Sequence, residues 1–338
     1  MIAPIPPLVV DLDGTLLRSD MLMETGIAFM RHQPANFFLP LKWLLRGKKS
    51  LKQGLAQNCE IDVSLLPYDP VVIEMIEVER KSGRTIILAT ATHHSLADKI
   101  AAHLNLFDLV LATDGSRNLT AERKRDLLVE LYGNRGFDYV GNSRDDLPVW
   151  AASRKAYVVN PETGVERRAK ALGNVKQVIV SNSSSYKDWQ QALRLHQWTK
   201  NALIFVPLLA AHQLTNLVLV WQGILAFVLF GLCASSVYLL NDLLDLADDR
   251  HHHSKRCRPF ASGKLSIKSG LLLFPLLLVV AFGGAAALLP WEFGAALVGY
   301  YVLTLLYSLL LKRRMAVDVI ALAALYTCLL YTSPSPPR

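Results

Sequence analysis

The sequence predicts two halves of different fold class: an α/β domain with a doubly wound parallel sheet, followed by an all-α domain of transmembrane helices. Before residue 180, short buried strand patterns alternate with amphipathic helical stretches, which is typical of a parallel sheet covered by helices. After residue 200, apolar runs approach the roughly 20 residues that span a bilayer. Apolar residues also make up 52% of the 338-residue chain, which is high for a wholly soluble protein.

The α/β half begins with the run LVVDLDGTLL, in which a short strand ends in Asp11 and Asp13 before a Gly-Thr turn. Carboxylates at the carboxyl end of such a strand lie where open α/β sheets place their chemistry. The same pattern of a strand followed by a loop or helix recurs at 85–92, 107–115, 137–146 and 155–161. Together these segments predict a Rossmann-like sheet.

A helical insertion separates the first two strands, and we expect it to form a small cap over residues 18–80. It contains the apolar side chains of Phe37, Phe38, Trp43 and Leu45 beside Lys48 and Lys49. Such residues either pack within the cap or dip into a lipid headgroup layer. We expect packing within the cap.

Five apolar runs follow in the second half, at 202–220, 221–240, 269–289, 293–311 and 316–331. His212 and Gln213 interrupt the first run, so a short helix and a polar turn is an alternative there. Segments rich in Lys and Arg alternate along the chain with loops that carry neither residue. By the positive-inside tendency, the basic loops and the N-terminal half face the cytoplasm. We therefore expect a multi-pass protein of the cell (inner) membrane, with the lipid bilayer as a partner.

The formal net charge of +8 fits cytoplasmic membrane loops and an anionic substrate. No basic stripe with interleaved aromatic residues is present in the sequence, so we expect no nucleic-acid partner. The four cysteines lack C-x-x-C spacing, which argues against a disulfide framework and against a zinc site.

Three aspartates follow the second apolar run: Asp242, Asp245 and Asp249. At about 100° per helical residue, steps of three and seven place their carboxylates within roughly 60° of one another on one helix face, while Asp248 falls off that face. Carboxylates this close repel one another unless a cation is bound, and their hard oxygen atoms suit Mg²⁺ that carries a phosphorylated substrate. The alternative is a membrane helix that ends in a charged, water-exposed turn.

Cationic groups crowd the following loop, and Mg²⁺-binding carboxylates that face Arg and Lys form a diphosphate clamp. The pattern Asn-Asp-x-x-Asp-x-x-x-Asp-Arg-x-His-x-x-Lys-x-x-Arg-Pro, at 241–259, resembles the first Asp-rich motif of the UbiA-type intramembrane prenyltransferase superfamily. Residues 194–205 and 307–319 also look like that superfamily, especially the branch typified by decaprenyl-phosphate phosphoribosyltransferase. One departure is His253, where that branch usually has Pro.

The resemblance implies that Asp242, Asp245 and Asp249 bind Mg²⁺. It also implies substrate-binding roles for Lys200, Asn201, Asn241, Arg250, Lys255 and Arg258. The implied substrates are a polyprenyl phosphate or diphosphate lipid, together with phosphoribosyl diphosphate or an aromatic acceptor.

A second resemblance, to the haloacid dehalogenase superfamily, rests on four motifs in the expected order. They are Asp-Leu-Asp-Gly-Thr at 11–15, Thr90, Lys124 and the acidic loop at 141–146. The resemblance implies that Asp11 attacks phosphorus as the nucleophile and that Asp13 is the general acid and base. Thr90 would hydrogen-bond a phosphate oxygen, and Lys124 would neutralise the phosphate charge.

The same resemblance implies a second Mg²⁺ site. Its ligands would be Asp11, the backbone at Asp13 and a carboxylate of the acidic loop. Asn142 stands at the usual first acidic place, so Asp146 becomes the expected ligand, with Asp145 nearby. A degenerate, noncatalytic domain is the alternative.

We expect residues 1–180 to form the hydrolase domain, 181–200 a linker with an interfacial amphipathic helix, and 201–327 a partial transferase domain. The Ser-Pro-Ser-Pro-Pro ending within 328–338 resembles a non-native tail after a C-terminal truncation. The expected function is a membrane enzyme of polyprenyl-lipid metabolism, in which a Mg²⁺-dependent transferase is fused to a phosphomonoesterase. An aromatic polyprenyltransferase, or a membrane-anchored phosphatase with an inactive transferase half, remain alternatives.

Overall fold

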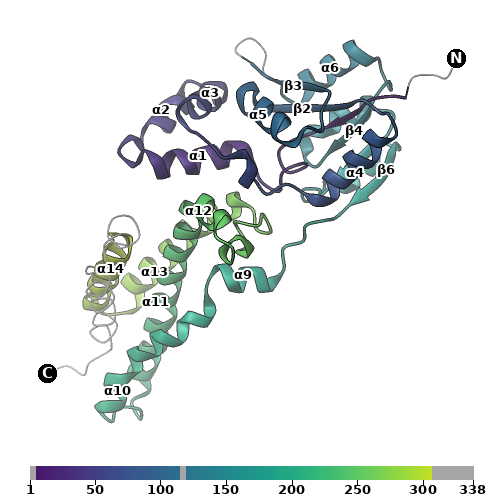
Figure 1. The fold of residues 1–338 in the computed structure, drawn as a ribbon. Helices are drawn as coiled ribbons and strands as arrows, with labels where there is room; N and C mark the ends of the chain where they lie inside the picture. The colour runs from purple at the N-terminus through teal and green to yellow at the C-terminus, as the bar shows by residue number, and fades with distance from the viewer. Residues whose placement is uncertain (1–4, 115–118, 307–338) are drawn as a thin grey trace. The chain divides into compact units, whose positions relative to one another are not determined.

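The computed structural model describes residues 5–114 and 119–306 and divides into two compact units (Figure 1). The first unit comprises Met1–Ser184, Arg250–Arg256 and Ala261–Ile267, and the second comprises Ser185–Asp249, Cys257–Phe260 and Lys268–Arg338. The boundary after Ser184 falls inside the polar stretch expected to be a linker.

The first unit is built on a six-stranded sheet with the order β3-β2-β1-β4-β5-β6, in which every neighbouring pair is parallel. The strands are β1 (Leu8–Val10), β2 (Ile86–His93), β3 (Leu109–Thr113), β4 (Asp138–Gly141), β5 (Ala156–Val159) and β6 (Val175–Ile179). The predicted doubly wound parallel sheet is confirmed. The sequence did not predict the edge strand β6, because its exposed Lys176 and Gln177 obscure the strand pattern.

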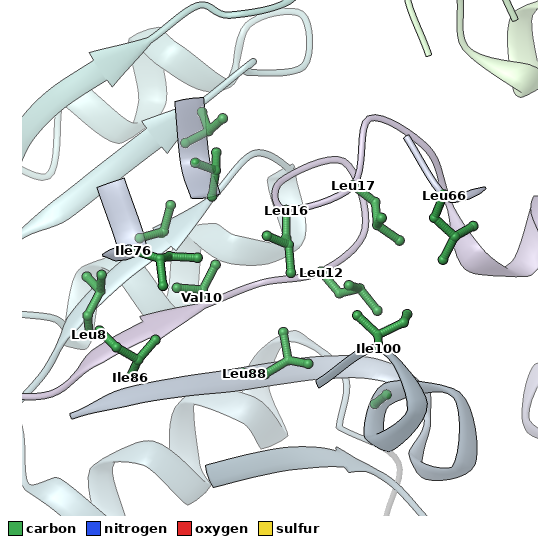
Figure 2. Packing of buried hydrophobic residues seen from close by; sticks show 14 of the residues in the cluster. Leu8, Val10, Leu12, Leu16, Leu17, Leu66, Ile76, Ile86, Leu88 and Ile100 are labelled. Atoms are coloured by element: carbon green, nitrogen blue, oxygen red, sulfur yellow. The ribbon is translucent and has the colours of Figure 1, made fainter. Parts of the chain in front are cut away.

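Successive residues of a strand point to opposite faces, so the sheet supports two separate cores. One core combines Leu8 and Val10 with side chains of α4 (Pro70–Lys81) and α5 (His94–Leu104) (Figure 2). The other combines Val9 with side chains of α6 (Ala121–Tyr132), α7 (Leu147–Ala152) and α8 (Val165–Lys170). Helices therefore cover both faces of the sheet.

Three helices of the insertion lie together outside these layers: α1 (Met21–His32), α2 (Leu39–Leu45) and α3 (Lys48–Asn58) (Figure 1). We call them the cap. Two short 3-10 helices, η1 (Pro34–Asn36) and η2 (Val63–Leu65), accompany them. α4 lies within the expected cap range of 18–80, yet it packs on the sheet core through Val72 and Ile76.

The second unit starts with α9 (Tyr186–Ala192), the 3-10 helix η4 (Leu195–Phe205) and α10 (Val206–Ala210). The long helix α11 (Leu217–Leu244) follows, capped at its start by the Asn216 side chain. The run at 202–220 is therefore not one membrane span. It forms short helices and a polar turn at 211–216, which was the alternative expected from His212 and Gln213.

Beyond α11, the chain forms α12 (Leu246–His251), the 3-10 helix η5 (Lys255–Cys257), α13 (Ile267–Leu288) and α14 (Trp291–Leu306). Among the described residues, α11 and α13 have the length and apolar composition needed to cross a membrane, while α14 is shorter, at 16 residues. Small residues such as Ala281 and Ala285 let α13 pack with α11 and α14 in one apolar cluster. The motif at 307–319, the run at 316–331 and the tail at 328–338 lie outside the described residues.

Candidate active sites

The first candidate site lies at the carboxyl end of the parallel sheet. Asp11 directly follows β1, Asp146 belongs to the loop after β4, and Lys124 projects from α6. The Lys124 Nζ atom donates to Asp11 Oδ1 at 2.7 Å and lies 3.9 Å from Asp146 Oδ1. Three residues that are far apart in the sequence meet here because parallel strands end at one edge of the sheet.

Tyr139 connects the two sides of this cluster. Its hydroxyl accepts a hydrogen bond from Lys124 Nζ at 3.0 Å and donates one to Asp146 Oδ1 at 2.7 Å. The other oxygen of Asp146 accepts from the backbone N–H groups of Asn142 and Ser143, at 3.0 and 2.9 Å. Asp146 is thereby held in a single orientation, as expected for a positioned ligand or charge. Asp145, in contrast, is exposed.

Asp13 is held from two sides. Its Oδ1 atom accepts from the backbone N–H of Met21, the first residue of α1, and its Oδ2 atom accepts from the Thr92 hydroxyl, both at 2.8 Å. The fully buried Thr90 accepts from the backbone N–H of Thr92 at 3.0 Å. Thr92 and Tyr139 are site residues that were not predicted from the sequence. The available signal for Thr92 was its spacing of two from Thr90, which places both side chains on one face of β2.

The turn after Asp13 requires glycine. Gly14 has a φ of +73°, and a Cβ atom at this position would lie 2.2 Å from the Asn142 amide nitrogen. The Thr15 hydroxyl also donates to Asn142 Oδ1, at 3.4 Å. Asn142 therefore packs against the turn that follows the nucleophile motif, where a charged Asp would add a further negative charge to the cluster.

The electrostatics of this site are unbalanced. Burial raises the pKa of Asp11 to about 7; the charges of Asp146 and Asp13 add to the rise, and Lys124 opposes it. Burial also raises the pKa of Asp13 to about 6, helped by the charge of Asp20. Burial alone would lower the pKa of Lys124, but Asp11 and Asp146 raise it above its ordinary value, so the ammonium group stays protonated.

This charge imbalance is the feature that fits a cation. Three carboxylates, those of Asp11, Asp13 and Asp146, share one lysine, and their hard oxygen atoms are the ligand type that Mg²⁺ prefers. Across residues 5–114 and 119–306, however, no three His, Cys, Asp or Glu side chains are already arranged as a metal cage. Mg²⁺ binding by these residues remains a prediction.

The second candidate site surrounds the Asp-rich motif of the second unit. Asp242, Asp245 and Asp249 are at most 4% exposed, whereas Asp248 is exposed. α11 ends at Leu244 with Asp245 as its C-cap, but the helical hydrogen bonds continue past this point. Asp245 N donates to Asn241 O at 2.9 Å, and Asp249 N donates to Asp245 O at 2.8 Å.

Two arginines bind this acidic motif. Arg258 Nη1 donates to Asp249 Oδ2 at 2.7 Å and to Asp242 Oδ1 at 3.1 Å. Arg194 Nη2 donates to Asp242 Oδ1 at 2.7 Å, and its guanidinium lies 4.5 Å from the centre of the Tyr238 ring. Arg258 is one of the predicted substrate-binding residues. Arg194 is not, although it begins the 194–205 segment that resembles the prenyltransferases.

The remaining predicted substrate-binding residues are placed differently. In the second unit, Asn201 is buried, Lys200 is exposed and Asn241 is half-buried. Arg250 and Lys255 belong to the first unit, where Arg250 donates to both carboxylate oxygens of Glu24, at 2.9 and 2.7 Å. Phosphate contacts by these residues remain predictions.

Comparison with protein families gives the class of each half. Residues 8–151 match the haloacid dehalogenase-like hydrolase family, and residues 202–331 match the UbiA prenyltransferase family. The chain is therefore a fusion of a haloacid dehalogenase-like domain and a UbiA prenyltransferase-like domain, and both families consist of enzymes. The prenyltransferase family is membrane-integral, in agreement with the two candidate spans.

Three relatives give more detail. The uncharacterized protein y4nM of Sinorhizobium fredii is 37% identical over 322 residues, which cover 95% of this chain and 62% of that protein. Nodulation protein NoeC of Azorhizobium caulinodans is 41% identical over 140 residues, covering 40% of this chain and 44% of NoeC. Decaprenyl-phosphate phosphoribosyltransferase of Mycobacterium tuberculosis is 33% identical over 140 residues, which cover 40% of this chain and 46% of that protein. This chain thus spans less than two thirds of each relative.

Proposed function

We propose that this protein is a multi-pass membrane enzyme of polyprenyl-lipid metabolism, with its N-terminal domain in the cytoplasm. The UbiA-type half transfers a phosphoribosyl group from phosphoribosyl diphosphate to a polyprenyl phosphate, with diphosphate as the leaving group, and the hydrolase half removes a phosphate from the lipid-linked product. The 33% identity to decaprenyl-phosphate phosphoribosyltransferase supports the transfer step. The single observation that carries the hydrolysis step is the Lys124–Asp11 ion pair at the end of β1.

In the hydrolysis step, an Asp11 carboxylate oxygen attacks the phosphorus atom while the ester P–O bond breaks. Asp13 donates its proton to the leaving alkoxide, and its raised pKa of about 6 keeps part of the population protonated near neutral pH. Asp13 then takes a proton from the water that attacks the aspartyl phosphate. Inorganic phosphate leaves and Asp11 is restored.

Lys124 stays charged throughout and stabilises the transferred phosphoryl group. Tyr139 and Asp146 hold the Lys124 ammonium in place. Mg²⁺, if held by Asp11, Asp146 and the backbone at Asp13, supplies additional neutralisation of phosphate charge.

In the transfer step, the Asp-rich motif and its arginines would hold a diphosphate. Asp242, Asp245 and Asp249 would hold Mg²⁺, which would neutralise diphosphate charge, and Arg258 and Arg194 offer planar guanidinium groups that suit phosphate. The carboxylates are buried beside an apolar helix, where charge has to be compensated.

Two substrate pairs test the transfer step with the purified full-length chain. Polyprenyl phosphate with phosphoribosyl diphosphate should yield a phosphoribosyl lipid, whereas polyprenyl diphosphate with hydroxybenzoate should yield nothing. Product formation only with the second pair would instead identify an aromatic polyprenyltransferase. Asp242→Asn should abolish transfer, and the matched control Asp248→Asn, an exposed carboxylate of the same Asp-rich motif, should retain it.

The hydrolysis step is tested with a synthetic phosphoribosyl lipid. Release of inorganic phosphate should require Asp11 and should be lost in Asp11→Asn. A protein that hydrolyses other phosphomonoesters but leaves this lipid untouched would contradict the proposed coupling. If Asp11→Asn removes all activity of the chain while Asp245→Asn changes none, the protein is a membrane-anchored phosphatase.

A further inference from the structure

The cap of the first unit presents a compact apolar surface, which we call the α2 face. It comprises α2 and the turn before it. Its exposed side chains are Phe37 (57%), Phe38 (73%), Leu41 (55%), Leu44 (46%) and Leu45 (83%). Five large apolar side chains within nine residues form a contiguous patch, which soluble surfaces rarely present without a partner.

Packing on the opposite side of α2 keeps this face outward. The Trp43 ring packs edge-on against Phe29, with ring centroids 5.4 Å apart. It also covers Gly54, where a Cβ atom would lie only 2.5 Å from Trp43 Cδ2. At about 100° per residue, Phe38, Leu41 and Leu45 lie within roughly 60° of one another and face away from Trp43. The expectation that these residues pack within the cap therefore holds for Trp43 alone.

The charge around the α2 face has one sign. Residues 25–59 contain no Asp or Glu, and their basic side chains are Arg31, Lys42, Arg46, Lys48, Lys49 and Lys52. Lys42, Arg46, Lys48 and Lys49 are exposed beside the apolar side chains. An apolar face flanked by cations is the composition of helices that lie in an anionic headgroup layer.

We propose that the cap is a membrane-contact element that inserts the α2 face into an anionic lipid surface. A second copy of the chain would cover the apolar side chains, but it would also bring two rings of like charge together. An anionic bilayer satisfies both features at once: it buries Phe38 and Leu45 among acyl chains and pairs the lysines with lipid phosphates. The second half matches a membrane-integral family, so a lipid surface is expected near the cap.

The cap also contacts the hydrolase site. The first backbone N–H of α1, at Met21, binds Asp13, and Lys52 of α3 donates to the carbonyl oxygen of Ala91 at 2.8 Å, one residue after Thr90. A cap seated on lipid would hold the hydrolase site where phosphate groups of membrane lipids are presented. This consequence rests on the proposed function, whereas the lipid contact itself does not.

Nitroxide labels on the full-length chain in lipid nanodiscs test the contact. Labels are placed at Phe38→Cys and Leu45→Cys, with Val78→Cys of α4, an exposed apolar position of the same unit, as the matched control. The background carries Cys257→Ser and Cys328→Ser; Cys59 and Cys233 are buried. Collision rates with oxygen and with a water-soluble nickel chelate are then measured.

In nanodiscs that contain phosphatidylglycerol, labels at 38 and 45 should favour oxygen over the nickel chelate several-fold more than the label at 78. The preference should weaken when phosphatidylcholine is the sole lipid. Equal nickel access at all three positions would overturn the proposal. Shielding of 38 and 45 from both reagents would also overturn it, because that result indicates a protein contact such as a second copy.

The double variant Phe38→Glu/Leu45→Glu separates the contact from the proposed substrate. Hydrolysis of soluble p-nitrophenyl phosphate should be unchanged, while hydrolysis of a phosphoribosyl lipid in nanodiscs should fall about 10-fold. If the labels report lipid contact but the wild-type chain hydrolyses no lipid phosphate, the contact stands and the proposed function fails. Loss of activity toward both substrates would overturn a role confined to lipid contact.

Discussion

Buried carboxylates at the two ends of the parallel sheet differ in how fully their charge is compensated. At the amino end of β4, the fully buried Asp138 accepts hydrogen bonds from Arg84 and from both Nε and Nη2 of Arg154, the latter two at 2.9 and 2.8 Å. At the carboxyl end of β1, Asp11 shares one lysine with two further carboxylates. Asp138 is therefore paired with two arginines, whereas Asp11, Asp13 and Asp146 share Lys124.

The pKa values follow this charge balance. Burial alone would raise the pKa of Asp138, but its hydrogen bonds to Arg154 and Arg84 hold it below its ordinary value. For Asp11 the same burial prevails over Lys124, and its pKa rises to about 7. The balanced end stabilises the fold, whereas the other end holds an excess of negative charge that a bound cation would neutralise. Such perturbed groups are typical of functional sites.

The sharpest test of this contrast removes the nucleophile. Asp11→Asn should lower the rate of phosphomonoester hydrolysis by about 10⁴-fold or more, because the amide cannot form the aspartyl phosphate. Steady-state kinetics with p-nitrophenyl phosphate measures the loss. Asp145→Asn, an exposed carboxylate of the acidic loop, is the control that should stay active. Residual activity within 10-fold of the parent would remove Asp11 from the nucleophile role.

The next largest effect concerns Lys124, the lysine paired with Asp11. Lys124→Met keeps most of the length of the side chain but removes its charge, and we expect hydrolysis to fall by about 10²- to 10³-fold. The pKa of Asp11 should rise further, because the opposing charge is gone. The kinetic loss is measured as above, and the pKa by NMR titration of the carboxyl carbon. An Asp11 pKa below the parent value would contradict the assigned balance.

At the other end of the sheet, Asp138→Asn should destabilise the fold by about 3 kcal/mol at pH 7, because two arginines lose their buried partner. The unfolded carboxyl has a pKa of about 3.9. Since the folded value is lower, this stability is present above about pH 5 and is lost as the pH falls through the folded pKa. Denaturant unfolding should therefore show a smaller difference in free energy of unfolding between parent and variant at pH 3 than at pH 7. A difference that does not change with pH would argue against a stabilising role of these ion pairs.

The smallest predicted effect has the opposite sign. The raised pKa of Asp11 means that its stability contribution is present below about pH 4 and is lost as the pH rises through about 7. Asp11→Asn removes this loss. In the presence of a chelator, the free energy of unfolding of the variant should therefore exceed that of the parent by about 1 kcal/mol at pH 8, and the two should be equal at pH 4. Denaturant unfolding at both pH values measures the difference. A parent that is more stable than the variant at pH 8 would show that the ionised Asp11 carboxylate does not destabilise the folded state.

Much of this arrangement could be predicted from sequence, for reasons that differ between the two sites. Asp242, Asp245 and Asp249 lie on one helical path, so their spacing alone predicts that they face the same way. Asp11, Lys124 and Asp146 have no such spacing, and only the order of their motifs indicated that they would meet. The partners Tyr139, Thr92 and Arg194 were missed, because nothing local marks a side chain whose role depends on what lies across a sheet or beside a neighbouring helix.

The sequence by itself determined the alternation of strands and helices, the apolar helices and the positions of both acidic motifs, because periodicity and residue type act locally. The tertiary structure alone decided which cation meets which carboxylate, how far burial shifts the pKa of Asp11, and that Trp43 turns inward while Phe38 and Leu45 face out. These properties depend on distance and desolvation. Both are set only when segments that are remote in the chain are packed together.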